Sequence, residues 1–549
     1  MTNILTNDIL YIENMEGEYH MENKKIKIYG VVLGIILFIL LISGLTYAIL
    51  NWRSSNITIT GTSECLEVES VKGSNITGSD LLLLDKSQVV NSNQITIRTG
   101  MVVTNITAKL KSSCTLDGYL TINLKTTTLN SGFTSSGKST GALKYVLASY
   151  NPSTYTTIST SALNGKTFDI LTTGSITSTG TLKIKDAQLS KDTTLAYLVI
   201  FYIDGDKANN DIGSNSTNFK TSIEATVTQG KLPFATQITN LYNDAIKTPV
   251  TNNSITYQYD TTNSLMKDIG NNIRYYGANP NNHIYFNCSD YSNQSSSTCE
   301  IWRIIGIFNG KVKLIRGSQI GSYSWDNKNV STGAESAYGK NDWTSARLMK
   351  LLNPGYSSET TGGSLYYNAK SGNCYSGQNN TTTACNFTST GIKNTKTRNL
   401  ISDTTYYLGG YTTNAVYPNQ IYGYERGTTV YTGRPTTWQG KIALAYPSDY
   451  GYAVDLEKCL NKQLNTYNDS TCTSNNWMKS IIAPNYGWLL THRSDTASQV
   501  WRVESTGFVN YYVYAYSSRG VAPVLYLNAN AKIKSGAGTS SEPYQLSVS

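Results

Sequence analysis

The sequence predicts an N-terminal transmembrane or signal helix, then an all-β antiparallel sandwich domain, and then an α+β domain. Three observations support this fold class. Residues 28–50 form an uncharged apolar run. The next part of the chain alternates apolar and polar residues with a period of two, which is typical of half-buried strands. The C-terminal half mixes such segments with short helical patterns.

The composition is that of a β-rich surface or secreted protein. At 549 residues the chain is too long for one core, so two or three domains are expected. Charged residues make up only 15% of the chain, against about 25% in average domains, and 41 Tyr stand against 10 Phe. Disordered chains have few aromatic residues, so general disorder is excluded. The net charge is +9, but the sequence has no dense run of Lys or Arg. Nucleic acid is therefore not predicted as a partner.

The apolar run predicts export. Residues 28–50 are long enough, at about 1.5 Å per residue, to cross a hydrocarbon layer of roughly 30 Å. Three lysines precede the run and one arginine follows it, which predicts that residues 1–27 stay in the cytoplasm while the C-terminal part faces outward. The run is either a retained anchor in the membrane or, because it ends in a signal-peptidase pattern, a signal cleaved after Ala48 to give a secreted protein. The four basic residues are Lys24, Lys25, Lys27 and Arg53.

Cysteine usage predicts disulfide bonds. All eight cysteines follow the apolar run, and the last six form neighbouring pairs separated by 11, 11 and 13 positions. Short loops closed in this way are typical of an oxidising compartment, and nearest-neighbour pairing is the simplest of many connectivities. Zinc ligation is not predicted, because CxxC spacing and neighbouring histidines are lacking. The cysteines are Cys65, Cys114, Cys288, Cys299, Cys374, Cys385, Cys459 and Cys472.

Residues 51–229 are predicted to form the β-sandwich domain. Short alternating segments, bounded by Gly, Ser, Asn and Asp, indicate antiparallel strands without a long helix. The stretch from Leu195 to Ile203 is apolar almost throughout, which predicts a central strand. The strand segments are 95–112, 119–125, 181–189, 194–206 and 222–229.

This first domain resembles a known family. The hydrophobic leader ending in TYA and the segments YLVIFYIDGDKANND and TSIEATVTQ are similar to those of camelysin/TasA-like secreted β-sandwich proteins of Gram-positive bacteria. The resemblance implies a matrix or surface protein, since relatives build extracellular fibres. Protease chemistry is not carried over, because the chain lacks an HExxH motif.

Residues 230–262 are predicted to be a linker, and residues 263–549 to be the second domain. Within this domain, a hairpin is predicted around Asn309-Gly310. Its segments resemble, in the same order, a bacterial extracellular domain of unknown function with a C-type-lectin-like, formylglycine-generating-enzyme-like α+β fold. The resemblance implies a fold and an extracellular location, but no activity. The segments are WRIIGIFNGKVKLIR, KNDWTSARLMKLLNPGY, RPTTWQGKIALAYPSDYGYA, GWLLT, VWRVESTGFVN and GVAPVLYLN.

No cofactor and no metal site are predicted. The chain has no cysteine after Cys472, so the paired active-site cysteines of sulfatase-modifying relatives are missing, and calcium-lectin motifs are absent. Oxygen ligands for Ca²⁺ could come from one aspartate-rich loop, but that loop lacks the EF-hand pattern and is predicted to be a solvated turn. Its carboxylates are Asp204, Asp206 and Asp211.

The protein is not predicted to be an enzyme, although a cell-envelope hydrolase remains an alternative. His492 stands near Ser494 and Asp495, but no GxSxG elbow accompanies them. Glycoside hydrolysis would need two carboxylates roughly 5–10 Å apart, which a sequence cannot establish. The carboxylate candidates are Glu425, Asp449, Asp495 and Glu504.

A tyrosine-rich strand is the predicted ligand-binding site. With a period of two, Tyr512, Tyr514 and Tyr516 share one face of the strand. Tyrosine stacks on sugar or peptide faces and donates a hydrogen bond at low entropic cost. Arg519 and Trp488 complete the candidate set. The alternative is that these tyrosines pack against neighbouring strands and show only their hydroxyls.

The sequence therefore predicts an exported, membrane-anchored bacterial surface protein. Its distal domain would bind a glycan, peptide or protein, as an adhesin does. The first alternative is a structural subunit that assembles into matrix or pilus-like fibres, so oligomers are possible. The second alternative is the cell-envelope hydrolase.

Overall fold

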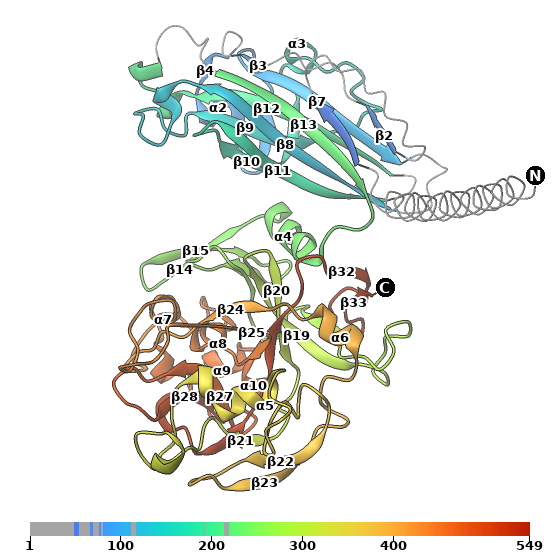
Figure 1. The fold of residues 1–549 in the computed structure, drawn as a ribbon. Helices are drawn as coiled ribbons and strands as arrows, with labels where there is room; N and C mark the ends of the chain where they lie inside the picture. Colours follow the sequence, from blue (N-terminus) through green and yellow to red (C-terminus); the bar gives the residue numbers. More distant parts are fainter. Residues whose placement is uncertain are drawn as a thin grey trace, which may run out of the picture. The chain divides into compact units, whose positions relative to one another are not determined.

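The computed structural model describes residues 49–53, 66–69, 76–77, 81–110, 117–190, 193–212 and 219–548. The chain divides into two compact units, Met1–Leu232 and Pro233–Ser549 (Figure 1). Both units are β-rich with few, short helices, which confirms the β-rich fold that the sequence predicts.

The N-terminal unit contains two sheets. Among the described residues, every strand pair in them is antiparallel, apart from the pair that joins β12 (Thr194–Asp204) to the short β4 (Leu83–Leu84). In the first sheet the order is β1 (Ile49–Arg53), β13 (Phe219–Gln229), β8 (Gly118–Leu129) and β11 (Gly180–Leu189), and β3 (Ile76–Thr77) also pairs with β13. In the second sheet the order is β2 (Leu66–Glu69), β7 (Val102–Leu110), β12 (Thr194–Asp204), β9 (Leu143–Ser149), β10 (Thr167–Ser175), β6 (Gln94–Thr96) and β5 (Val90–Asn91), with β4 (Leu83–Leu84) beside β12.

The two sheets bury one aliphatic core between them. Alternate residues of β8, such as Ile122, meet alternate residues of β12, such as Val199. The other face of β12 is buried too, because Leu198 and Ile200 belong to a second apolar cluster. A strand that is buried on both faces reads as a continuous apolar run. The predicted central strand at Leu195–Ile203 is therefore confirmed.

One predicted strand of the N-terminal unit is wrong. The sequence predicts a single strand over 95–112, whereas the structure has β6 and β7 with a turn between them. Gly100 adopts φ +94 in this turn, and a Cβ there would lie 2.6 Å from the Cβ of Leu82. The left-handed conformation at Gly100 ends the extended run.

The structure differs from the prediction for the linker. Residues 233–262 belong to the C-terminal unit, where α4 (Phe234–Asp244), β14 (Thr248–Asn252) and β15 (Ile255–Asp260) occupy most of this range. The buried face of α4 includes Phe234, Ile238 and Tyr242, at helical spacing. Proline and many polar residues make this stretch look like a linker in the sequence. Pro249 is tolerated because β14 is an edge strand, where a missing N–H costs little.

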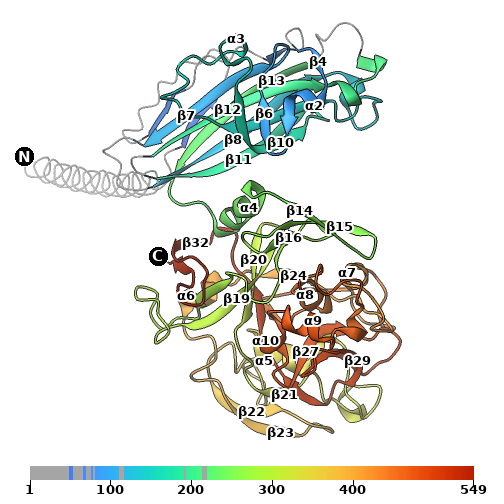
Figure 2. The ribbon, with the colours of Figure 1, turned by 180° about the vertical axis from the view of Figure 1, so that it is seen from behind.

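The C-terminal unit is built on two larger sheets (Figure 2). The nine-stranded sheet runs β14, β15, β16 (Leu265–Lys267), β17 (Ile273–Tyr275), β19 (Glu300–Phe308), β20 (Lys311–Arg316), β31 (Val524–Tyr526) and β26 (Ile442–Ala443), and β18 (His283–Phe286) pairs with β19. The five-stranded sheet runs β21 (Ser322–Ser324), β30 (Ser518–Gly520), β27 (Tyr486–His492), β28 (Gln499–Glu504) and β29 (Val509–Tyr514). Further two-stranded sheets are β22 (Ser371–Tyr375) with β23 (Thr382–Asn386), β24 (Thr404–Tyr407) with β25 (Thr437–Gly440), and β32 (Lys532–Ser535) with β33 (Gln545–Ser547).

Short α-helices and one predicted hairpin complete this unit. The hairpin between β19 and β20 is confirmed, and both turn residues have positive φ, 48° at Asn309 and 72° at Gly310. The helices are α5 (Arg347–Leu352), α6 (Thr395–Leu400), α7 (Pro418–Glu425), α8 (Pro447–Tyr452), α9 (Ser470–Ser474) and α10 (Lys479–Ile482).

Three nearest-neighbour disulfides confirm part of the cysteine prediction. They join Cys288 to Cys299, Cys374 to Cys385 and Cys459 to Cys472. Cys65 and Cys114 lie outside the described residues. Because such bonds persist in oxidising surroundings, the three pairs indicate an extracellular environment.

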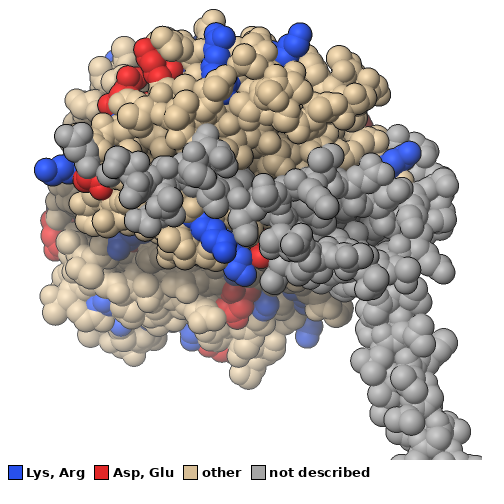
Figure 3. Space-filling view, turned by 90° about the horizontal axis from the view of Figure 1, so that it is seen from above, with Lys and Arg blue, Asp and Glu red and all other residues tan. Residues whose placement is uncertain are grey.

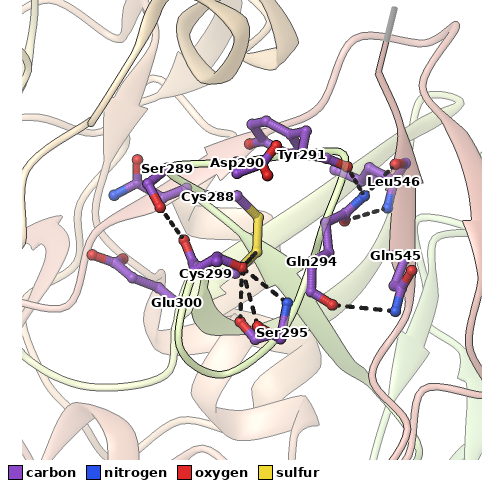
Figure 4. The surroundings of a disulfide bond; sticks show 12 residues. Cys288, Ser289, Asp290, Tyr291, Gln294, Ser295, Cys299, Glu300, Gln545 and Leu546 are labelled. Atoms are coloured by element: carbon purple, nitrogen blue, oxygen red, sulfur yellow. Dashed lines mark hydrogen bonds between the residues drawn. A yellow bond between two sulfur atoms is a disulfide. The ribbon is translucent and has the colours of Figure 1, made fainter.

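The loop closed by Cys288 and Cys299 fastens the C-terminal strand (Figure 4). The side-chain amide of Gln294 donates to the carbonyl of Leu546, and its oxygen accepts from the Leu546 N–H at 2.8 Å. Gln545 donates to the carbonyl of Gln294. The disulfide thus closes the loop whose Gln294 is hydrogen-bonded to β33.

The predicted membrane segment lies almost entirely outside the described residues. Only Ile49 and Leu50 are described, and they form strand β1, paired with Thr228 and Val227, so the predicted helix does not extend to residue 50. Among the described residues, no helix has the length and apolar character needed to cross a membrane. Membrane anchoring therefore stays a prediction.

Candidate functional site

The tyrosine-rich segment forms β29 and the turn after it. Tyr512 and Tyr514 are exposed, whereas Val513 and Ala515 are buried. Tyr516 is half-buried. The period-two alternation predicted for these residues is therefore observed, and it turns three tyrosines away from the core.

Tyr338 joins two of the predicted tyrosines. Its ring lies 4.4 Å from the ring of Tyr514, centroid to centroid, at an interplanar angle of 18°. Tyr514 in turn stacks on Tyr516 at 5.8 Å and 14°. We call these three residues the tyrosine stack. Tyr338 is 44% exposed and Tyr514 is 37% exposed, so the stack presents aromatic surface to solvent.

The loop of Tyr338 approaches β29 closely because of a glycine. Gly339 has φ +90, and a Cβ there would lie 2.2 Å from the carbonyl oxygen of Asp326 and 2.8 Å from the backbone nitrogen of Tyr516. That nitrogen donates to the carbonyl of Tyr338. Sequence analysis missed Tyr338, because nothing local in the chain links it to a strand so far away.

The other three predicted ligand residues, Tyr512, Arg519 and Trp488, contact different neighbours and are not part of the tyrosine stack. The ring of Tyr512 meets Tyr511 edge-on at 5.0 Å. The guanidinium of Arg519 lies 5.2 Å from the ring of Tyr486. Trp488 is only 2% exposed and donates its indole N–H to the carbonyl of Tyr323. Its assignment as a ligand contact is wrong, because the five-stranded sheet buries it as a core residue.

The three weak calcium candidates are not gathered into a cluster of metal ligands in the part of the chain that the structure describes. The carboxylate of Asp204 accepts from the backbone N–H of Asp206, and Asp211 accepts from the N–H of Lys138 and the hydroxyl of Ser139. Within the described ranges, no three His, Cys, Asp or Glu side chains lie close enough to hold a metal ion. Two of the three aspartates act as loop caps, as expected for a polar turn.

The residues around His492 do not form a triad. Asp495 pairs with Arg493 through two hydrogen bonds, at 2.5 and 2.8 Å, instead of with the histidine. His492 is buried, and burial lowers the pKa of its imidazole to about 4. The hydroxyl of Ser494 and the Nε2 of His492 are buried without a hydrogen-bond partner among the described residues. A neutral, enclosed imidazole without an ordering carboxylate lacks the arrangement that activates a serine.

The four carboxylate candidates for hydrolysis are all engaged or enclosed. Glu425 and Asp449 are fully buried. Glu425 accepts from the N–H and hydroxyl of Ser448, and burial raises the pKa of its carboxyl to about 7. Glu504 pairs with Arg502 at 2.7 Å, as Asp495 does with its own arginine. The geometry thus offers no open carboxylate pair from this set.

Asp449 instead belongs to a buried ionic network that sequence analysis did not predict. Its carboxylate lies 2.5 Å from Lys313 and 2.9 Å from Arg274, and Arg274 also pairs with Asp268 at 2.5 Å. All four side chains are at most 1% exposed. Burial lowers the pKa of Lys313 to about 8, against the opposing pull of Asp449. In the sequence, Lys313 looks like a solvent-facing strand residue.

Charged side chains are scattered elsewhere. Figure 3 shows Lys and Arg interspersed with Asp and Glu among mostly uncharged side chains on the described part of one face. Comparisons of the sequence with profiles of known protein families and with curated proteins find no match.

Proposed function

We propose that this protein is an exported bacterial surface protein whose C-terminal unit recognises a glycan, peptide or protein ligand through the tyrosine stack. The stacked, solvent-facing rings of Tyr338 and Tyr514 carry the proposal. Stacked tyrosines present a flat apolar face edged by hydroxyls, which suits a sugar ring or a peptide plane. The three disulfides support an extracellular location.

We extend the proposal to the fold family of each unit. The C-terminal unit would be a C-type-lectin-like domain, and the N-terminal unit a camelysin/TasA-like sandwich that supports it. The mixture of two sheets with short helices in residues 233–548 is compatible with the first assignment. The two face-to-face sheets in the N-terminal unit are compatible with the second.

A structural subunit of fibres is the second candidate function. Leu82 and Leu83, beside and within β4, are 55% and 60% exposed. Adjacent exposed leucines favour contact with another surface, such as a second copy of the chain. In that case the N-terminal unit, and not the tyrosine stack, would make the functional contact.

An array of glycans and cell-surface polymers tests the proposal. The full chain is compared with the variant Tyr338→Ala/Tyr514→Ala and with Leu460→Ala, which removes another exposed apolar side chain (50% exposed) from the same unit. We expect selective binding by the wild type and Leu460→Ala, and at least a roughly tenfold loss in the double variant. Folded wild-type protein that binds nothing on the array, while forming high-molecular-weight assemblies, would favour the fibre subunit.

A further inference from the structure

A cavity of about 390 Å³ lies in the C-terminal unit beside the turn between β19 and β20. It is lined by residues of that turn, of β24 and of α7, together with Arg426, which follows α7 directly. The volume falls within the range of small-molecule sites, roughly 300–1,000 Å³. No residue of the tyrosine stack lines the cavity, so it is a separate site.

Arg426 is fixed in the cavity wall by aromatic rings. Its guanidinium lies 3.5 Å from the ring centroid of Tyr422, 5.4 Å from that of Tyr407 and 5.5 Å from that of Tyr446. Its Nη1 donates to the carboxylate of Glu425 and the carbonyl of Tyr422. The other N–H groups of the guanidinium have no acceptor among the described residues. Arg426 is therefore oriented in advance and keeps free donors.

A second cation faces the same space. Lys311 lines the cavity, and its ammonium donates one hydrogen bond, to the hydroxyl of Ser402 at 2.8 Å. The lining residues include these two cations and no carboxylate. Two cations in the lining of one cavity, without a carboxylate in that lining, favour binding of an anionic group there.

The charged groups behind the cavity wall do not cancel the positive charge of Lys311 and Arg426. Arg274 and Lys313 lie 4.6 and 5.0 Å from the ring of Phe308, which lines the cavity. With the two cations of the lining, the cluster holds four cations against three carboxylates, a net charge of at least +1. The cations are Arg274, Lys311, Lys313 and Arg426, and the carboxylates are Asp268, Glu425 and Asp449.

The rest of the lining suits a hydroxylated ring. Tyr407 is 37% exposed and offers a flat aromatic face. The hydroxyls of Thr404 and Thr405 can donate and accept, and the hydroxyl of Tyr422 accepts from the side-chain amide of Asn272, which leaves its own proton for a ligand. A lining that contains both aromatic faces and hydroxyl and amide groups matches the apolar faces and hydroxyls of a sugar.

We propose that this cavity binds an anionic saccharide, with Lys311 and Arg426 pairing with its carboxylate or phosphate and Tyr407 lying against the sugar ring. The site goes beyond the recognition surface proposed above and does not depend on it. A carboxylate and a phosphate ester present the same chemistry to the two cations, and the experiment separates them.

Calorimetric titration of the full chain tests the site with four probes: glucuronic acid, glucose 6-phosphate, glucose and inorganic phosphate. Arg426 is left intact, because its loss would strand the buried Glu425. The variants are Lys311→Gln and Tyr407→Ala. The side chain of Lys311 makes a single hydrogen bond, and Tyr407 is hydrogen-bonded to Tyr446 through its backbone N–H and carbonyl. Lys458→Gln is the matched control, a surface lysine 59% exposed.

We expect at least one of the two anionic sugars to bind, and the tighter one identifies the anionic group. Lys311→Gln should weaken that binding roughly tenfold and Tyr407→Ala roughly fivefold, while Lys458→Gln and Tyr338→Ala/Tyr514→Ala leave it unchanged. The proposal is overturned if neither acid binds at millimolar concentration or if both cavity variants bind like the wild type. It is also overturned if glucose or inorganic phosphate binds as tightly as the anionic sugar.

Discussion

The two units of the chain fill their interiors in different ways. Between its two sheets, the N-terminal unit packs mostly aliphatic side chains from alternating strand positions. The described part of the C-terminal unit encloses an ionic network around Asp449, six buried tryptophans and three disulfides. Polar and charged groups are costly to bury unless each is paired, so such an interior depends on individual contacts. The tyrosine stack and the cavity both belong to the C-terminal unit, whose interior depends on such individual contacts.

The largest expected effect comes from breaking the ionic network. Asp449→Ala leaves Lys313 and Arg274 without their shared carboxylate in a buried position. Removing one partner of a buried pair costs about 3–5 kcal/mol. Denaturation of the full chain, with hydrogen exchange to locate the change, should show this loss in the C-terminal unit alone.

The matched change in the other unit is Ile122→Ala, at a core position of β8. It should cost about 2–5 kcal/mol and act only on the N-terminal unit. If Asp449→Ala costs less than a surface substitution, the network does not contribute to the stability of the C-terminal unit as described.

A smaller effect is expected from Cys288→Ser/Cys299→Ser. The disulfide closes a loop with a sequence separation of 11, and its removal should lower the free energy of unfolding by about 3 kcal/mol. Because Gln294 in this loop is hydrogen-bonded to Leu546, amide exchange in β33 should also become faster. Unchanged exchange in β33 would show that the loop does not fasten the C-terminal strand.

Glu425 gives a pH-dependent difference between the units. Burial raises the pKa of its carboxyl to about 7, above the value of 4.5 for an exposed glutamate. Between these values the folded state keeps a proton that the unfolded state has lost, so the stabilising contribution of Glu425 falls as pH rises from 4.5 to 7. Glu425→Gln should become more stable relative to the wild type over this window, by at most about 3 kcal/mol.

The comparison with Glu425→Gln is needed because His492 acts in the opposite direction. The pKa of its imidazole is lowered to about 4, so the unfolded state binds the extra proton between pH 4 and 6.5 and stability rises with pH there. The measurement is urea denaturation of both proteins at several pH values. A stability difference that stays constant from pH 4.5 to 7 contradicts the assignment of the titrating group.

The smallest effect concerns the tyrosine stack itself. Tyr338→Ala/Tyr514→Ala removes two exposed rings whose mutual stacking is worth about 0.5–1.5 kcal/mol. Since each residue is also more than half buried, the free energy of unfolding should fall by about 2 kcal/mol in all, as judged by thermal denaturation. A larger loss would mean that the rings support the fold instead of forming a binding surface.

The sequence predicts best where one pattern determines one structure. The apolar run from Leu195 to Ile203 indicates β12, and the alternation around Val513 indicates which tyrosines face outward. Lys313 cannot be predicted in this way, because its burial depends on Asp449, which is distant in the sequence. The places of Trp488 and Tyr338 could not be predicted for the same reason. Trp488 is hydrogen-bonded to Tyr323 in the core and Tyr338 stacks on Tyr514, and both partners are distant in the sequence.

We propose that the C-terminal unit recognises a ligand while the N-terminal unit supports it. The most direct test compares binding of the full chain to the glycan and polymer array after exposed apolar residues are removed from one unit or the other. Tyr338→Ala/Tyr514→Ala should abolish selective binding, whereas Leu82→Ala/Leu83→Ala in the N-terminal unit should leave it intact. Loss of binding only in the leucine variant would contradict this division of roles and assign the functional surface to the N-terminal unit.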